Sequence, residues 1–283
     1  MNNKSTGERL EFYDFSDVTV EHLHRYAIAN DIVKNKVVLD LASGEGYGSY
    51  NLSKSASKVI GVDIDEKTVF DARKKYVNVN LSFIVGTADK IPVDSNSIDV
   101  VVSFETIEHH DKHDEMLSEI KRVLKDDGVL IMSSPDKKYY SDLTGQQNPF
   151  HVKELYFREF KELIDKSFQF TKYYYQNSFN FNSFISSFEN INKFKVFYGD
   201  EHGLKDESIE PLYNIVIASE VDDYSICDSF FNGTQITKRA NDRFEQIIRS
   251  NLTLEWKKSN TFKIGNFIIF PFYKIKQKLK QIF

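Results

Sequence analysis

A short apolar run that breaks into three alternating glycines is the feature that most constrains the fold of this chain. Residues 37–41 are apolar except for Asp40, and they predict a short buried strand. The glycines alternate with other residues, at Gly44, Gly46 and Gly48. Glycine tolerates positive φ and lets a ligand approach the backbone, so this turn suits a small polar cofactor. The spacing is G-x-G-x-G rather than the G-x-G-x-x-G of dinucleotide sites, and the turn alone is also compatible with a structural role.

The composition is that of an ordinary globular protein and does not indicate nucleic acid or a membrane span. The chain has 283 residues and a formal net charge of −5, which argues against nucleic acid as its main partner. A single cysteine, Cys227, excludes an internal disulfide. No run reaches the ~18 apolar residues of a membrane span, and residues 1–8 lack the apolar core of a signal peptide. We therefore expect a cytoplasmic protein.

Strand-like and helix-like segments alternate after the glycine turn. The predicted strands cover residues 37–41, 58–63, 81–85, 98–103 and 129–133, with helices at 66–76 and 113–125 between them. This alternation predicts an α/β fold with a doubly wound, mostly parallel sheet. Ligands of such sheets bind beyond the carboxyl ends of the strands, where the strand order reverses. Asp63, Asp89 and Phe104 stand at those ends together with the glycine turn, so we expect them at one rim.

Four motifs in order resemble the class I S-adenosylmethionine (SAM)-dependent methyltransferases, over residues 20–220. The motifs lie at residues 38–48, 59–63, 86–92 and 122–130. The resemblance implies a seven-stranded Rossmann-like sheet and SAM as the cofactor. NAD sites also use an acidic residue after the second strand, which makes a dehydrogenase the competing interpretation. The glycine spacing and the second acidic residue at the rim, Asp89, favour SAM.

The resemblance also assigns parts of SAM to particular residues. The glycine turn would face the methionine part, and Asp63 would accept hydrogen bonds from the two ribose hydroxyls. Ile64 would pack on the adenine and Asp89 would accept from its amino group, with Ala88 beside it. The full set of predicted cofactor-binding residues is Arg25, Asp40, Ala42, Gly44, Gly46, Gly48, Asp63, Ile64, Ala88, Asp89 and Phe104.

Three further segments narrow the resemblance. Residues 21–26, 104–109 and 148–154 are similar to methyltransferases of surface-polysaccharide or O-antigen synthesis, which implies a sugar or glycan precursor as the methyl acceptor. A catalytically silent partner subunit is an alternative, which the intact glycines and Asp63 disfavour. An RNA methyltransferase is another, which the acidic balance disfavours.

The segment after the fourth strand is where the methyl acceptor should lie. Methyl transfer from a sulfonium is an in-line displacement, so the enzyme positions the acceptor and removes the proton of a hydroxyl. Histidine titrates near neutrality, and we predict His109 or His151 as the general base, with Glu108 also in the catalytic set. A structural role for these side chains remains the alternative.

The same residues also form a candidate metal site. Two carboxylates and two imidazoles, from Glu105, Glu108, His109 and His151, have the chemistry to hold Mg²⁺ or Mn²⁺. The pattern resembles metal-assisted O-methyltransferases that modify small-RNA 3′ ends or act in ubiquinone synthesis. Packing of a Glu-His pair at a helix start is the competing interpretation.

The remaining expectations concern domain organisation and partners. We expect an N-terminal arm and lid helix at residues 1–32, a SAM-binding domain at 33–220 and a C-terminal helical extension at 221–283. Within the domain, residues 177–210 would form an aromatic-rich insertion on the acceptor side. The tail at 267–283 mixes aromatic residues with lysines and could lie on an anionic membrane surface, although packing on protein is equally compatible.

Overall fold

The computed structural model describes residues 16–145, 147–191, 193, 195–207, 209–259 and 262. The chain divides into a main unit, Met1–Gly233, and a second unit, Thr234–Phe283. The predicted arm at residues 1–15 and the tail at 267–283 lie outside the described residues.

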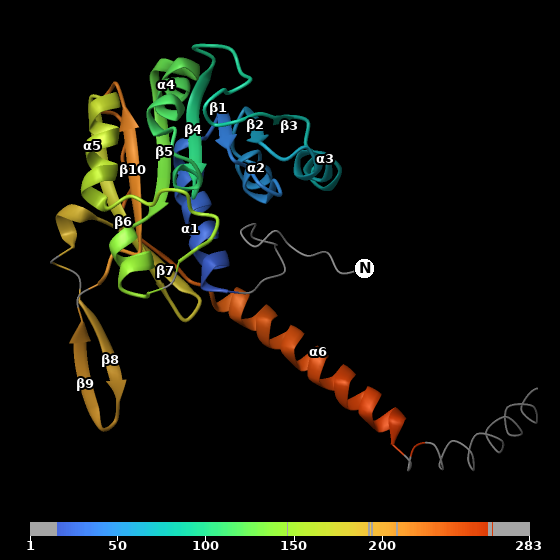
Figure 1. Ribbon diagram of the computed structural model, residues 1–283. Coiled ribbons are helices and arrows are strands. Elements are labelled where there is room, and N and C mark those ends of the chain that lie inside the picture. Colours follow the sequence, from blue (N-terminus) through green and yellow to red (C-terminus); the bar gives the residue numbers. More distant parts are fainter. Residues whose placement is uncertain are drawn as a thin grey trace, which may run out of the picture. The chain divides into compact units, whose positions relative to one another are not determined.

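A nine-stranded sheet forms the centre of the main unit (Figure 1). Its order is β11-β7-β6-β10-β5-β4-β1-β2-β3. The strands are β1 (Val37–Leu41), β2 (Lys58–Asp63), β3 (Leu81–Val85), β4 (Ile98–Phe104), β5 (Leu124–Pro135), β6 (Phe170–Phe179), β7 (Asn182–Ser187), β10 (Tyr213–Ser219) and β11 (Ser229–Phe231). Strands β1 to β5 pair in parallel, whereas β10 pairs antiparallel with both β5 and β6. The strand order reverses between β1 and β4, which is where a ligand crevice opens in sheets of this kind.

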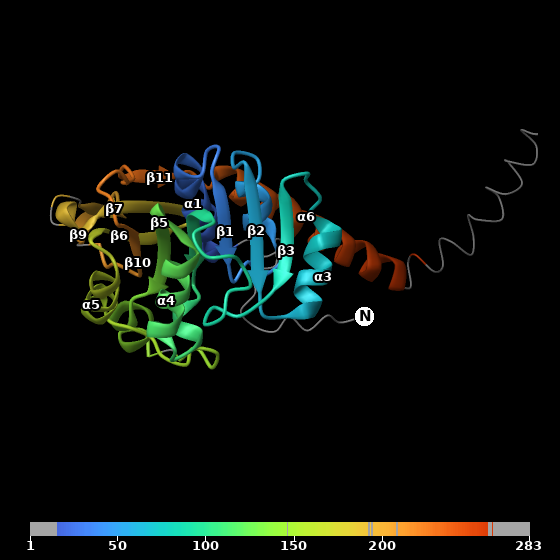
Figure 2. The same cartoon turned by 90° about the horizontal axis from the view of Figure 1, so that it is seen from above.

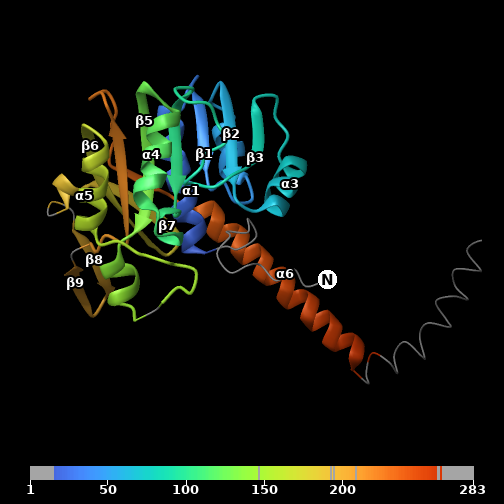
Figure 3. The same ribbon diagram turned by 45° about the horizontal axis from the view of Figure 1, so that its top comes forward.

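Helices cover both faces of this sheet (Figures 2 and 3). They are α1 (Asp17–Ile32), α2 (Tyr47–Leu52), α3 (Glu66–Lys75), α4 (His113–Val123) and α5 (Phe157–Ser167). Successive residues of a strand point to opposite faces, so Leu39 packs in the core under α4 and α5 while Val38 packs under α1 and α2. The central strands are buried on both faces, as their nearly continuous apolar sequences predict.

The predicted fold class is confirmed, but the sheet has nine strands instead of seven. The extra strands are β7 and β11, and both come from segments that we expected to lie outside the sheet. Strand β7 lies inside the predicted insertion at 177–210 and continues from β6 through a tight turn. Strand β11 lies inside the predicted helical extension at 221–283 and pairs with β7.

Two other segments stand apart from the sheet. Strands β8 (Val196–Asp200) and β9 (Gly203–Glu207) belong to the same insertion and form a two-stranded hairpin of their own (Figure 1). The second unit contains the 25-residue helix α6 (Thr234–Lys258). No helix within the described part of the chain is long and apolar enough to cross a membrane.

Candidate functional site

A cavity of about 1110 Å³ opens at the carboxyl ends of β1 to β4. Its walls include residues that directly follow each strand: Ala42 to Glu45 after β1, Ile64 and Asp65 after β2, Gly86 to Lys90 after β3, and Glu105 and Thr106 after β4. This brings the predicted rim residues Asp63, Asp89 and Phe104 to one space. The position agrees with the point at which the strand order reverses.

The glycine turn owes its shape to left-handed backbone. Ala42, Gly44 and Gly46 have φ of 61°, 51° and 85°, a region that favours glycine and strains an alanine. Gly44 and Ala42 line the cavity, whereas Gly46 and Gly48 serve packing behind it. A Cβ on Gly48 would lie 1.9 Å from the ring of Tyr26, so this glycine makes room for a tyrosine that lines the cavity.

Backbone amides hold the Asp63 carboxylate at the end of β2. One oxygen accepts from the Gly44 N–H at 2.9 Å and the other accepts from the Asp65 N–H at 3.0 Å. The side chain is 6% exposed and lies in the cavity wall. Each carboxylate oxygen can accept a second hydrogen bond, so the fixed carboxylate can receive two neighbouring hydroxyls.

Asp40 lies beneath the turn and not in the cavity wall. Its carboxylate accepts from the Ser49 hydroxyl at 2.6 Å and from the Tyr26 hydroxyl at 3.2 Å. Burial raises the pKa of Asp40 to about 7, against the opposing effect of these two hydrogen bonds. In this structure Asp40 therefore connects the turn to α1, which is an indirect relation to any ligand.

The end of the cavity predicted to bind adenine also contains Lys112, which the sequence analysis did not identify. Ile64 and Ala88 line the cavity there, and Ile64 is 69% exposed. The Lys112 ammonium donates to the Asp89 carboxylate at 2.5 Å. This hydrogen bond, together with one from Thr87, lowers the pKa of Asp89 to about 2.

Arg25 is buried and is not part of the cavity wall. Its guanidinium is fully buried, donates to Gln176 Oε1 at 2.7 Å and lies 4.7 Å from the centre of the Tyr213 ring. It approaches Glu105 Oε1 at 3.9 Å, and Glu105 does line the cavity. Only Nη1 of the guanidinium has a hydrogen-bond partner among the described residues, and the buried Nε and Nη2 atoms have none. The predicted contact of Arg25 with the cofactor stays a prediction.

The other end of the cavity brings together Glu108, His109 and His151. One ligand atom from each lies within 4.8 Å of the others. His109 belongs to the short helical turn η1 (Ile107–His109), while His151 comes from the segment before α5. Glu105, the fourth residue of the predicted metal set, is not part of this cluster. Its backbone has a φ of 51°, and its carboxylate accepts from the Ser133 hydroxyl at 2.7 Å.

Hydrogen bonds fix which nitrogen of each histidine is basic. His109 Nδ1 donates to the Phe150 carbonyl at 3.2 Å, and His151 Nδ1 donates to Glu154 Oε1 at 2.5 Å. The Asn148 amide donates to Nε2 of His151 at 3.1 Å, which requires the lone pair at that atom. In both histidines Nε2 thus carries the lone pair. At His151 that lone pair accepts from Asn148, so a proton or a cation at Nε2 would have to displace this hydrogen bond.

Glu154 is the positioning residue that sequence analysis missed. It lies three residues before α5, which begins at Phe157. The Glu154 carboxylate is nearly buried and accepts from both His151 and the Ser141 hydroxyl, the latter at 2.8 Å. The spacing H-x-x-E at residues 151–154 was the available signal, since it places a carboxylate within reach of the imidazole.

Aromatic side chains complete the wall beside the histidines. Tyr140 lies in the π-helical turn η2 (Lys138–Asp142) and stacks on the His151 ring, with ring centres 5.4 Å apart. Tyr213, Phe150 and Tyr26 also line the cavity. These residues come from distant parts of the chain, and no motif in the sequence connects them.

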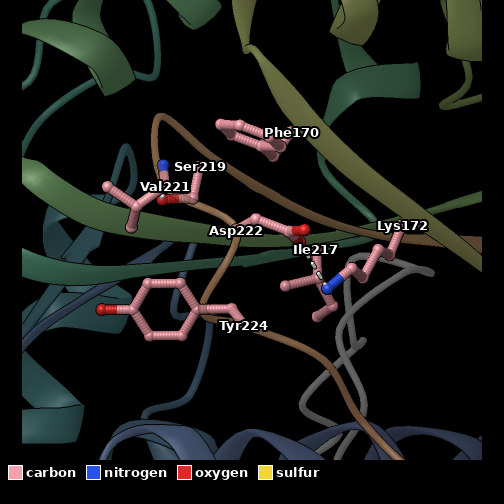
Figure 4. Close-up of a pocket in the computed structure, with 7 residues that line it drawn as sticks. All are labelled: Phe170, Lys172, Ile217, Ser219, Val221, Asp222 and Tyr224. Carbon is pink, nitrogen blue, oxygen red and sulfur yellow. Dashed lines mark hydrogen bonds and ion pairs between the residues drawn. The ribbon is translucent and has the colours of Figure 1, made fainter.

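A second, much smaller pocket lies between β6 and β10 (Figure 4). Its volume of about 10 Å³ has room for a single water molecule at most. Lys172 and Asp222 form an ion pair of 2.7 Å at its wall. This pocket is too small to hold a substrate.

Comparison with known proteins agrees with the geometry. Residues 39–132 match the family described as a methyltransferase domain. A probable S-adenosylmethionine-dependent methyltransferase of Mycolicibacterium smegmatis is 38% identical over 129 residues, which cover 45% of this chain and 49% of that protein. A demethylmenaquinone methyltransferase of Chlamydia felis is 28% identical over 42% of this chain and 54% of its own length. The chain thus spans about half the length of the curated relatives it matches.

The fold has counterparts among solved structures. A SAM-dependent methyltransferase of Thermotoga maritima, described as a possible histamine N-methyltransferase, superposes with a TM-score of 0.52 at 17% identity. The match covers 72% of this chain and 91% of that one. At this identity the likeness concerns the fold, which is that of the class I methyltransferases.

Proposed function

We propose that this chain, which carries a SAM-dependent methyltransferase domain with the class I fold, transfers a methyl group from SAM to a hydroxyl of a sugar or glycan precursor. One observation carries the proposal. A single cavity has an anchored carboxylate, Asp63, beside a glycine turn at one end and two histidines with basic Nε2 atoms at the other.

The first end suits the donor. SAM has a ribose with two adjacent hydroxyls, and the carboxylate of Asp63 is held by the backbone amides of Gly44 and Asp65 in a position to accept both. Hydrogen bonds to a charged group contribute about 1.5–3 kcal/mol each, so this contact would be a large part of the binding free energy. The exposed Ile64 side chain offers an apolar surface for the adenine.

The second end suits a hydroxyl acceptor. His151 is held by Glu154 in the tautomer whose lone pair is at Nε2, and the acceptor hydroxyl would replace the Asn148 amide at that atom. The nearby carboxylate stabilises the imidazolium that would form. The displacement at the methyl group then needs only the in-line approach of the hydroxyl oxygen. We assign His151 as the general base, and His109 as its neighbour, with ring centres 5.2 Å apart.

The character of the wall favours a neutral polyol. Glu105 and Glu108 would repel an anionic acceptor group, while their carboxylates can accept from sugar hydroxyls. Tyr140 and Phe150 offer ring faces against which the apolar side of a sugar ring can pack.

The experiment is a transfer assay with methyl-tritiated SAM against nucleotide sugars and cell-envelope glycans. We expect label in a sugar hydroxyl with wild-type protein and none above background with Asp63→Ala. Transfer to lipid quinones but to no sugar would overturn the acceptor class and leave SAM-dependent transfer standing. Equal labelling by the Asp63→Ala variant would overturn the donor site.

A second candidate is metal-assisted transfer to the same class of acceptor, favoured by the cluster of Glu108, His109 and His151. One carboxylate and two imidazoles are a suitable donor set for a divalent cation such as Mg²⁺ or Mn²⁺, and two hydrogen-bonded Nδ1 atoms would orient both imidazoles toward it. A bound cation would lower the pKa of an acceptor hydroxyl.

Chelation separates the two candidates. Metal assistance predicts that EDTA abolishes transfer and that Mn²⁺ or Mg²⁺ restores it, with SAM affinity unchanged. Transfer that is indifferent to EDTA would leave His151 to act as the base alone.

A further inference from the structure

We infer that helix α6 of the second unit binds the surface of an anionic phospholipid bilayer. The first observation is an imbalance of charge between the two units. Residues 234–283 contain eleven lysines and arginines and three acidic residues, a net charge of +8. Because the whole chain has a charge of −5, residues 1–233 carry −13. The smaller unit is thus strongly basic, whereas the rest of the chain is acidic.

The second observation is the exposed apolar face of α6. Phe244, Ile248 and Leu252 follow one another at intervals of four residues, which places them on one side of a helix. They are 64%, 41% and 58% exposed, and Ile247 and Leu254 beside them are exposed to a similar degree. A helix that presents such side chains to solvent needs an apolar partner.

The two observations together identify the partner. A bilayer surface accepts apolar side chains at the headgroup boundary and attracts cations when its lipids are anionic. Trp256, 58% exposed near the end of α6, is of a residue type enriched at that boundary. The sequence after α6 continues the composition, since residues 262–283 contain five lysines, five phenylalanines and no acidic residue.

Other occupants match only half of these features. The acidic main unit of another copy would satisfy the positive charge but would leave the apolar side chains of α6 against a charged surface. A coiled coil with a second copy would bury the apolar face but would bring two units of charge +8 together. An anionic bilayer satisfies both.

The test is co-sedimentation of the full chain with vesicles of phosphatidylcholine, with and without about one-third phosphatidylglycerol. We expect at least about tenfold stronger partition into the anionic vesicles, and a decline as salt is raised, because the charges of the headgroups are screened. Equal partition into neutral and anionic vesicles, or no partition into either, would overturn the inference.

Matched substitutions distinguish binding through α6 from nonspecific adsorption of exposed apolar side chains to vesicles. The double variant Phe244→Glu with Ile248→Glu changes the apolar face, and Phe197→Glu with Leu204→Glu makes the same change of charge on the exposed β8–β9 hairpin. Partition should fall at least about fivefold in the first and stay unchanged in the second. A second pair of measurements, helix content and SAM binding, verifies that both variants fold.

Self-association is the competing outcome and has its own readout. Sedimentation equilibrium without vesicles should give the same mass for wild type and for the Phe244→Glu, Ile248→Glu variant. A stable dimer that this variant dissociates would assign the apolar face to a second copy and would overturn the lipid assignment.

Discussion

The two ends of the cavity are built in opposite ways. At the donor end, backbone groups of neighbouring strand ends hold the functional carboxylate, as Gly44 and Asp65 hold Asp63. At the acceptor end, side chains hold side chains, as Glu154 and Asn148 hold His151. The donor end is therefore fixed by the sheet itself, whereas the acceptor end depends on individual residues that can be exchanged without rebuilding the fold.

This difference fits the division of labour that we propose. A cofactor common to many enzymes can be bound by a site made of backbone, because its shape never changes. An acceptor that differs from one enzyme to the next needs a site whose side chains can vary. Substitutions at the acceptor end should accordingly change turnover with little effect on SAM affinity, and substitutions at the donor end should do the reverse.

The largest expected effect is at the proposed base. His151→Ala should lower kcat by about two to four orders of magnitude, the usual contribution of general acid–base catalysis, with SAM affinity unchanged. Steady-state kinetics and calorimetry measure the two quantities, and His202→Ala on the exposed β8–β9 hairpin is the control. A variant that keeps its kcat while His109→Ala loses it would move the role of base to His109.

The buried carboxylate beneath the glycine turn should affect stability and its dependence on pH. The folded-state pKa of Asp40, about 7, lies above its ordinary value of 3.8, so the folded protein holds a proton that the unfolded chain releases. The buried carboxylate therefore lowers the free energy of unfolding. This loss of stability is absent below pH 4 and complete above pH 7. Asp40→Asn should remove it and stabilise the protein at pH 8 relative to pH 4, by on the order of 4 kcal/mol at most. Parallel denaturation curves of the two proteins at all pH values would contradict this assignment.

The contact between Glu154 and His151 should matter less than the histidine itself. Glu154→Gln removes the acceptor charge that holds the His151 tautomer, and we expect kcat about tenfold lower with little change in KM. Glu154→Asp, which restores a carboxylate, should recover part of the loss. Equal behaviour of the Gln and Asp variants would show that Glu154 only fills space.

The ion pair at the adenine end should have the smallest effect. The pKa of Asp89, held at about 2 by Lys112 and Thr87, lies below its ordinary value, so the pair stabilises the folded protein above pH 4 and ceases to do so as the pH falls toward 2. An ion pair whose side chains are both partly exposed to solvent contributes little to stability. Lys112→Met should therefore change the stability lost on acidification only slightly. Thermal unfolding at pH 2.5 and pH 6 measures the difference, and a large change would place the pair among the main stabilising contacts.

The contrast between the two ends of the cavity also explains which parts of the fold and the site could be predicted from the sequence. The strands, their parallel order and the donor end follow from local patterns, since the glycine turn and Asp63 adjoin strands that the apolar runs predict. At the acceptor end only the residue types were predicted, including Glu108, His109 and His151. Their contact depends on where the segment before α5 lies, and no local pattern determines this. The buried surroundings of Arg25 were not predictable for a related reason, since its partner Gln176 is 151 residues away. The two extra strands likewise depend on pairing between distant segments.

Calorimetric titration of SAM into two variants tests the division of the cavity most directly. We predict that Asp63→Ala weakens SAM binding at least about tenfold, because it removes a charged acceptor, while His151→Ala binds SAM as wild type does. Asp63→Ala that binds SAM with wild-type affinity, or His151→Ala that loses it, would contradict the account.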